Sequence, residues 1–304
     1  MSGVPTANLR LERIELTTGV ALNVCLGGRE DGEPILFLHG FPESHRTWRN
    51  QLDALSRDHF VIAPDQRGFA GSDRPEGVEQ YETGKIVQDA MALMDALGID
   101  RFTLAGHDWG GAVAWSTALQ HPIRVERLIV VNAPHPLVFQ KSLIEDAEQR
   151  KASQYIRYLR SPLAEAAITS MGLETFLEKM LLSHVDATKL PEEERRLYID
   201  DWKQPGALTS MLNWYRAAKV EVPSPGEEAE APLWTRAPFP KLLMPTLVVW
   251  GLNDPALLPV QLDGLPDLVE NLRIVTSPSA GHFIPWEEPG TVTAAIRDFL
   301  AETA

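Results

Sequence analysis

Cysteine is almost absent from this sequence, and long hydrophobic runs are missing. The single cysteine, Cys25, excludes an internal disulfide framework, and its apolar surroundings in residues 20–26 predict a buried structural thiol. No apolar run reaches the roughly 20 residues that a membrane-spanning helix needs, and residues 1–11 show no signal-peptide pattern. We therefore expect a soluble, cytoplasmic protein with no membrane partner.

Positive charge is scarce as well. Against 42 Asp and Glu stand 28 Lys and Arg, and the resulting net charge of -14 would repel a nucleic-acid backbone. No run rich in Lys or Arg offsets this charge locally, so we expect no nucleic-acid partner. A small uncharged organic substrate is the better expectation. The sequence does not choose between a monomer and a homodimer.

Patterns for binding metals and nucleotides are also missing. The eight histidines include no His-x-x-x-His pair, and the glycine-rich segments follow no phosphate-binding pattern. We therefore predict neither a metal nor any other cofactor.

Short apolar runs alternate with helical patterns over most of the 304 residues, a length that can bury a large core. The first two runs predict an antiparallel pair, and the later alternation predicts right-handed crossovers between parallel strands. The predicted strands are residues 11–16, 20–26, 35–38, 60–63, 102–105, 128–131, 246–250 and 272–275. The predicted helices of this part are residues 47–55, 83–97, 110–119 and 289–304.

The alternation stops between residues 134 and 240, where helical patterns and Glu/Arg clusters occur without a convincing strand. Residues 223–240 contain five prolines and an acidic cluster, which predict an exposed excursion rather than a helix. We therefore expect a core domain of residues 1–133 and 241–304. A helical cap domain of residues 134–240 is predicted to follow the sixth strand.

The predicted strand at 102–105 runs directly into Gly-His-Asp-Trp-Gly-Gly at residues 106–111, and a helix follows. Small residues on both sides permit a sharp turn that presents the Asp108 carboxylate at the N-terminus of this helix. This pattern is typical of a nucleophile elbow. Taken alone, Asp108 could instead cap the helix.

A second loop, His-Gly-Phe-Pro at residues 39–42, follows the strand at 35–38. In a fold with a nucleophile elbow, this loop and the residue after the nucleophile each donate a backbone N–H to an oxyanion hole. We assign these two donors to Phe41 and Trp109. His39 is expected to stabilise the turn rather than to act in catalysis, and the bond before Pro42 can be cis.

Two further loops complete a possible catalytic triad. Asp254 follows the strand at 246–250, and His282 lies between the strand at 272–275 and the last helix. Singly, a turn aspartate and a structural histidine would be the default roles. The order nucleophile, acid, histidine at the ends of separate strands favours Asp254 as the orienting acid and His282 as the base.

A carboxylate nucleophile indicates a reaction at a saturated carbon. Asp108, ionised at neutral pH, can displace a leaving group and form an alkyl ester, which water activated by His282 would hydrolyse. An epoxide oxygen that leaves as an alkoxide needs a proton donor, and Tyr155 and Tyr215 stand out in the cap. Each could instead be a half-buried helix aromatic.

Four motifs together resemble the soluble epoxide hydrolases of the α/β-hydrolase superfamily, over nearly the whole chain. They are His-Gly-Phe-Pro-Glu-Ser at 39–44, Asp-Gln-Arg-Gly-Phe-Ala-Gly-Ser-Asp at 65–73, the elbow at 106–111 and Asn-Trp-Tyr-Arg at 213–216. The resemblance implies the α/β-hydrolase fold, with a mostly parallel eight-stranded sheet and helices on both faces. It also implies an enzyme that needs no cofactor and converts an epoxide to a vicinal diol.

In the resembled family, two cap tyrosines donate the proton that opens the ring. The Asn-Trp-Tyr-Arg match carries this role onto Tyr215, and Tyr155 matches the other position. Tyr158 remains a rival of Tyr155, because residues three apart share one helix face. The substrate pocket is expected to be lined by these residues: Phe41, Trp109, Phe139 and Trp214.

Haloalkane and haloacid dehalogenases share the first three motifs and are the main alternative. A tryptophan after the nucleophile often binds the departing halide there, so Trp109 fits both activities. Phe41 stands where haloalkane dehalogenases commonly carry a second halide donor, Asn, and Trp109 and Ala112 stand where fluoroacetate dehalogenases carry arginines. Epoxide hydrolysis is therefore the preferred prediction. A non-catalytic binding protein and a serine-type esterase are weaker alternatives, because the triad is complete and its nucleophile is Asp108.

Overall fold

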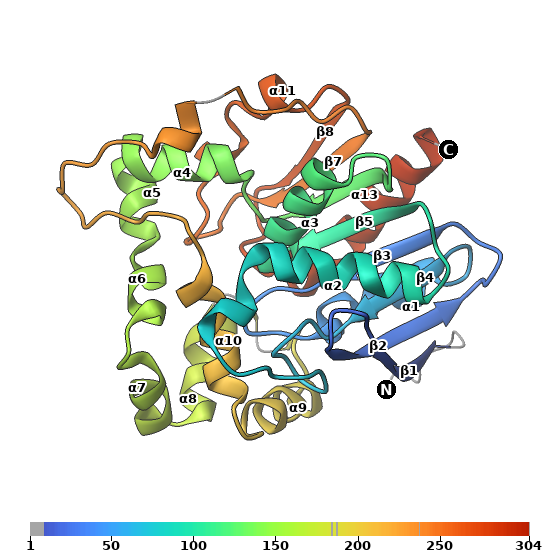
Figure 1. Cartoon of the computed structure of the whole chain (residues 1–304), viewed down its shortest axis with the longest axis horizontal. Helices are drawn as coiled ribbons and strands as arrows, with labels where there is room; N and C mark the ends of the chain where they lie inside the picture. The colour runs from blue at the N-terminus through green and yellow to red at the C-terminus, as the bar shows by residue number, and fades with distance from the viewer. Residues whose placement is uncertain (1–8, 184, 187, 237, 304) are drawn as a thin grey trace.

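One eight-stranded sheet forms the centre of the computed structural model, which describes residues 9–303 except 184, 187 and 237 (Figure 1). The strand order is β1-β2-β4-β3-β5-β6-β7-β8. β2 is antiparallel to both of its neighbours, whereas the pairs from β4 to β8 are all parallel. The strands are β1 Leu9–Glu15, β2 Ala21–Gly28, β3 Pro34–Leu38, β4 Phe60–Pro64, β5 Phe102–His107, β6 Val125–Val131, β7 Thr246–Gly251 and β8 Leu272–Ser277.

The eight predicted strands are confirmed, with shifts at their ends. β6 begins at Val125, three residues earlier than predicted, and β5 continues to His107. The helix predicted at 47–55 is wrong in its first turn. A 3-10 turn, His45–Trp48, stands there, and α1 follows at Arg49–Leu55.

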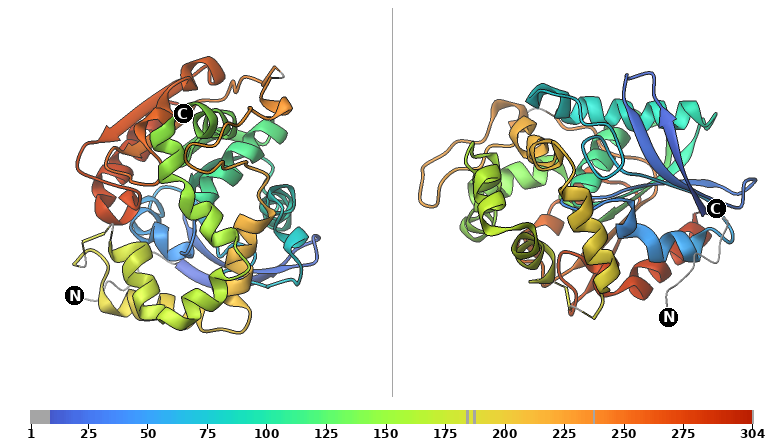
Figure 2. Two further views of the ribbon diagram at one scale, coloured as in Figure 1. Left: turned by 90° about the vertical axis from the view of Figure 1, so that its left-hand side faces the viewer. Right: turned by 90° about the horizontal axis from the view of Figure 1, so that it is seen from below.

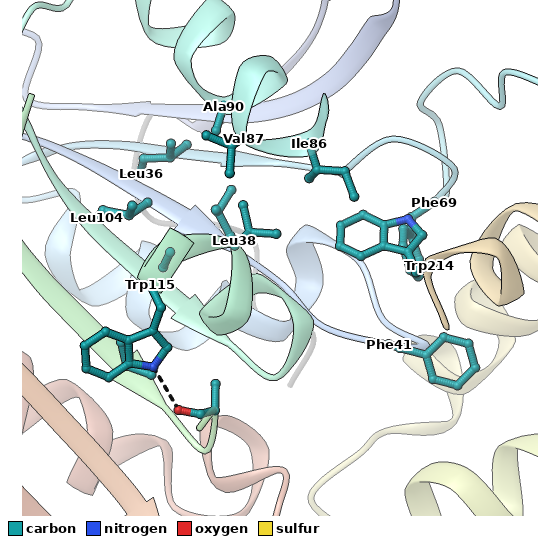
Figure 3. Close-up of a cluster of buried hydrophobic side chains, with 14 of the residues drawn as sticks. Leu36, Leu38, Phe41, Phe69, Ile86, Val87, Ala90, Leu104, Trp115 and Trp214 are labelled. Atoms are coloured by element: carbon teal, nitrogen blue, oxygen red, sulfur yellow. Dashed lines mark hydrogen bonds between the residues drawn. The ribbon is translucent and has the colours of Figure 1, made fainter. Parts of the chain in front are cut away.

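Alternate residues of the central strands belong to two apolar clusters on opposite faces of the sheet. Leu104 of β5 packs in the cluster that contains residues of α2 Thr83–Ala96 and α3 Trp109–Gln120 (Figure 3). The next residue, Ala105, belongs to the cluster with α1 and α13 Pro289–Glu302. Figure 2 shows helices on both sides of the sheet. Coverage of both faces explains why these strands appear as continuous apolar runs.

Between β6 and β7 the described residues form helices and loops but no strand. These helices stack beside the sheet in Figure 1. Residues 223–240 carry one short 3-10 turn, Leu233–Arg236, and no α-helix among their described residues. The helices are α4 Pro136–Glu145, α5 Ala147–Ala152, α6 Gln154–Arg160, α7 Ala164–Met171, α8 Leu173–Leu177, a π-helical turn Glu178–Leu182, α9 Glu192–Trp202 and α10 Ala207–Ala217.

Two buried indoles join these helices to the loops that follow β3 and β4. Trp202 of α9 donates its indole N–H to the carbonyl of Pro42 at 2.9 Å. Trp214 of α10 donates to the carbonyl of Arg67 at 3.0 Å. These hydrogen bonds connect the first turn after β3 to α9 and connect the segment after β4 to α10.

Cys25 is buried in β2, as the sequence predicts. Burial, with a smaller contribution from the charge of Asp65, raises the pKa of its thiol to about 11, which suits a structural role. None of the helices in the described ranges has both the length and the apolar character needed to cross a membrane.

Candidate active site

Asp108 lies at a sharp turn between β5 and α3, with a left-handed φ of 51°. Glycines make this turn possible. A Cβ on Gly106 would lie 2.3 Å from the carbonyl oxygen of Gly110, and one on Gly40 would lie 2.4 Å from Asp108 itself. The predicted strand-to-helix elbow is thus present, and the loop after β3 approaches the carboxylate directly.

The two oxygens of Asp108 have different partners. Oδ1 accepts a hydrogen bond of 2.8 Å from the backbone N–H of Phe41, whereas Oδ2 lies 3.5 Å from Nε2 of His282. Burial alone would raise the pKa of Asp108, but the hydrogen bond and charge of His282 hold it below the usual value. Asp108 is therefore ionised at neutral pH. The Phe41–Pro42 peptide bond is cis.

Asp254 contacts His282 at Nδ1, the ring nitrogen that does not face Asp108. Its Oδ2 lies 2.7 Å from Nδ1 of His282, and its Oδ1 accepts backbone hydrogen bonds from Ala256 at 2.8 Å and Leu257 at 2.9 Å. Burial opposes ionisation of Asp254, yet His282 and these donors lower its pKa on balance. The predicted triad residues are brought together in the predicted order.

The protonation of His282 depends on both carboxylates. Burial would lower its pKa, but the charge of Asp254 and the hydrogen bond to Asp108 outweigh burial and raise the pKa well above the usual value. In the resting protein His282 therefore carries a proton at neutral pH and forms ion pairs with Asp108 and Asp254.

Two tyrosines from the helical segment lie near the nucleophile. The rings of Tyr155 of α6 and Tyr215 of α10 are 6.2 Å apart, edge to face, and Tyr215 lies 5.1 Å from Trp109. Burial, reinforced by the negative charge of Asp108, raises the pKa of both tyrosines well above 10, so both are protonated. Tyr158, the rival of Tyr155, is 47% exposed.

Trp109 and Tyr215 meet edge to face, and this contact partly offsets the rise in the pKa of Tyr215. The net direction remains upward, so the Tyr215 hydroxyl keeps its proton.

A cavity of about 390 Å³ contains Asp108 and both tyrosines in its lining. Apart from Asp108 and Lys219 the lining is uncharged, and it is mostly apolar. Such a cavity is in the size range of small-molecule sites. The lining residues are Thr83, Asp108, Trp109, Ala112, Ser116, Pro134, Pro136, Phe139, Tyr155, Ile156, Tyr215, Ala218, Lys219, Val220, Trp234 and Leu257.

The four residues predicted to line the pocket divide into two pairs. Trp109 and Phe139 lie in the lining. Phe41 and Trp214 do not. The ring of Phe41 packs 5.0 Å from that of Tyr215, and Trp214 packs 5.3 Å from Phe69 (Figure 3). Each packs against a residue of the cavity wall, Phe41 against Tyr215 and Trp214 against Trp109, and their contact with substrate stays a prediction.

Sequence reasoning missed a buried chain of polar groups behind His282. His107 Nε2 lies 2.7 Å from the carbonyl oxygen of His282, and His107 Nδ1 lies 3.3 Å from Oε2 of Glu43. The indole of Trp286 donates to the other Glu43 oxygen at 2.7 Å. His107 and Glu43 stand within motifs of the sequence, but their contact joins the end of β5 to the loop after β3, which lie far apart in the sequence.

Asn132, at the end of β6, was also missed. Its side chain donates to Oδ2 of Asp254 at 2.8 Å and accepts from the backbone N–H of Gly251 at 2.8 Å. Its left-handed φ of 39° is unusual for a residue other than glycine. An Asn directly after a buried strand, at the sheet edge where this fold places its sites, is the signal that could have identified it.

His39, predicted to stabilise its turn, does so. Its Nδ1 lies 2.8 Å from the carbonyl of Gly40, and its Nε2 accepts from the backbone N–H of Gln66 at 2.9 Å. Among the residues that the structure describes, no group of three or more His, Cys, Asp or Glu side chains could hold a metal ion.

Comparisons with known proteins agree with this architecture. A family model described as alpha/beta hydrolase fold matches residues 33–289. The AB hydrolase superfamily protein YfhM of Bacillus subtilis (strain 168) is 36% identical, over 93% of this chain and 96% of its own length. Epoxide hydrolase A of Mycobacterium tuberculosis (strain ATCC 25618 / H37Rv) is 32% identical over 98% of both chains.

A solved structure gives the same result. It comes from work on novel epoxide hydrolases in metagenomes from hot environments, is 44% identical and superimposes with a TM-score of 0.89 over 96% of this chain and 99% of its own. The chain therefore belongs to the α/β-hydrolase superfamily and, within it, to the epoxide hydrolase family.

Proposed function

We propose that the protein hydrolyses a small, uncharged organic epoxide to a vicinal diol through an ester on Asp108. One observation carries this proposal: the ionised Asp108 lies between a histidine held by a second carboxylate and two protonated tyrosines that line an apolar cavity. Nucleophile, base and acids thus converge on one cavity.

In the first step, Oδ2 of Asp108 attacks an epoxide carbon and forms the ester bond, while the bond from that carbon to the epoxide oxygen breaks. Oδ2 is the attacking atom because Oδ1 is held by the N–H of Phe41. The departing oxygen takes the proton of Tyr215 or Tyr155. Both tyrosines hold this proton at neutral pH, because burial and the charge of Asp108 raise their pKa.

In the second step, the ester is hydrolysed by water. Ester formation removes the negative charge of Asp108, and with it one of the two interactions that raise the pKa of His282. The lowered pKa lets His282 return its proton, through water, to the tyrosinate left by the first step and then accept one from the attacking water. Negative charge that develops on Oδ1 is stabilised by the backbone N–H groups of Phe41 and Trp109. Collapse of the adduct breaks the bond from the Asp108 carbonyl carbon to Oδ2, the departing oxygen takes the proton from His282, and the proton of the new Asp108 carboxyl returns to His282 as the diol leaves.

The helices between β6 and β7 supply the cavity wall in this proposal. Residues 134–240 act as a cap domain over a core domain of residues 1–133 and 241–304, in the cytoplasm. Phe41, at the position where haloalkane dehalogenases commonly carry a second halide donor, weighs against the dehalogenase alternative. No cofactor, nucleic acid or membrane takes part.

The test is a single turnover in ¹⁸O-labelled water, with enzyme in excess over styrene oxide and a panel of aliphatic epoxides. The diol formed first carries unlabelled oxygen, and peptide mass spectrometry finds the label on Asp108. Labelled oxygen in the first diol would contradict the ester mechanism. Bromide release from 1-bromobutane without diol from any epoxide would favour dehalogenation.

A further inference from the structure

The end of α10 and the segment after it are attached to α6 by side chains. We call residues 218–223 the strap. Arg157 of α6 donates to the carbonyl of Val222 at 2.8 Å, and Gln154 donates to that of Pro223 at 2.9 Å. The strap also forms part of the cavity wall, through Ala218, Lys219 and Val220.

Arg160, the last residue of α6, makes the densest of these attachments. Its Nε donates to the carbonyl of Tyr215 at 2.8 Å, its Nη1 to that of Val220 at 2.8 Å and its Nη2 to that of Ala218 at 3.0 Å. One planar guanidinium therefore holds three backbone carbonyls across the end of α10.

This attachment lies at and just beyond the end of α10, where the Tyr215 carbonyl has a long hydrogen bond of 3.4 Å from the backbone N–H of Ala218 as its other partner. The last carbonyls of a helix have no intrahelical donor, and a cation is favourable beside them. Among the described residues no carboxylate forms an ion pair with Arg160. The guanidinium of Arg160 is directed to the end of α10 and to the strap.

We infer that Arg160 is a positioning residue for epoxide opening: it fixes the end of α10 so that the Tyr215 hydroxyl faces the cavity next to Asp108. The inference rests on the proposed function. α6 then serves both acids, because it carries Tyr155 directly and holds Tyr215 through Arg160.

Tyr215 has little freedom to tolerate a shift of its backbone. Its ring packs edge to face against Phe41 at 5.0 Å, Trp109 at 5.1 Å and Tyr155 at 6.2 Å. A displacement of about 1 Å at a reacting group can cost roughly 10²-fold in rate. Release of the helix end should therefore slow the step that uses the Tyr215 proton.

The experiment compares Arg160→Ala and Arg160→Lys with the unchanged protein by stopped-flow, which separates ester formation from ester hydrolysis. We expect Arg160→Ala to slow ester formation about tenfold or more, with hydrolysis of the ester changed less than about twofold. Arg160→Lys should recover part of the rate, since a lysine can reach one carbonyl but cannot hold three. Equal slowing of both steps by both variants would overturn the inference.

Arg157→Ala is the matched control, because Arg157 is on the same helix and bonds the strap farther from Tyr215. It should leave both steps nearly unchanged. An equal loss in Arg157→Ala and Arg160→Ala would show that the strap as a whole matters and would contradict the specific role of Arg160. Thermal unfolding of each variant reports any general loss of stability.

A double-mutant cycle tests whether Arg160 acts on ester formation through Tyr215. In a Tyr215→Phe background, Arg160→Ala should have almost no further effect on ester formation, whereas in a Tyr155→Phe background its effect should persist. A full effect in the Tyr215→Phe background would refute the inference. This outcome is distinct from failure of the proposed function, which would appear as no ester on Asp108 in the unchanged protein.

Discussion

The core half and the cap half of the site are held in place in different ways. Asp108 and Asp254 follow the ends of parallel strands, and each receives backbone hydrogen bonds directly on its carboxylate. The tyrosines stand on helices whose placement depends on ring packing and on side chains such as Arg160. This difference predicts a division of roles between the two halves. The core supplies the nucleophile and the groups that hydrolyse the ester, whereas the cap assists only the opening of the ring.

The strongest test of this division removes the core nucleophile. Asp108→Ala should abolish diol formation and ester formation together, because the variant lacks the attacking oxygen. Product analysis by chromatography measures the loss. Asp263→Ala, which changes an exposed aspartate outside the site, is the control and should retain full activity. Turnover by Asp108→Ala would contradict the assignment of Asp108 as the nucleophile.

Replacement of the base should separate the two steps. His282→Gln keeps a polar side chain but cannot accept a proton, so the ester should form and persist, and steady-state turnover should fall by about 10³-fold. Intact-protein mass spectrometry would detect the enzyme with one substrate attached. If no ester accumulates and turnover is still lost, His282 is needed before hydrolysis and the division is incorrect.

The cap should affect the first step alone. Tyr215→Phe removes one of two proton donors and should slow ester formation by about 10²-fold, with the rate of ester hydrolysis unchanged. Stopped-flow tryptophan fluorescence measures both. Tyr158→Phe, on the exposed face of α6, is the matched control and should behave as the unchanged protein. Ester formation at full rate in Tyr215→Phe would remove Tyr215 from the proposal.

The smallest expected effect is a shift in pH dependence. Hydrolysis needs neutral His282, so its rate should fall by about tenfold per pH unit below the pKa of His282 in the ester. That pKa should lie below the pKa of His282 in the resting protein, because burial lowers it and the ester has lost the charge of Asp108 that helps to raise it. Single-turnover decay of the ester against pH, compared with an NMR titration of the resting protein, measures the difference. Equal pKa values of His282 in the ester and in the resting protein would show that the two carboxylates are not coupled through His282.

Local patterns predicted the core half of the site well. The strand before Asp108, the glycines at residues 106, 110 and 111 and the position of His282 before the last helix are all features of contiguous sequence. Because parallel strands end at one edge of the sheet, loops that follow them converge. The positions of Asp108, Asp254 and His282 relative to one another therefore follow from the order of strands.

The cap half was less predictable, because its geometry depends on packing between helices. Sequence could not choose between Tyr155 and Tyr158, which share a helix face by spacing, whereas the structure exposes Tyr158. Trp214 was expected among the cap residues of the pocket, but it is adjacent to Tyr215, and adjacent residues on a helix point in different directions. It packs toward Phe69 instead.

The unequal partners of the Asp108 oxygens have a consequence for the fate of each atom. Oδ1 is held by the N–H of Phe41, and Oδ2 faces His282. In the proposed cycle the diol departs with Oδ2, and the oxygen of water takes its place, whereas Oδ1 stays with the protein. If the carboxylate does not rotate between turnovers, many cycles in labelled water would exchange Oδ2 alone. Asp108 would then keep Oδ1 from its synthesis and receive a new Oδ2 with every diol that it releases.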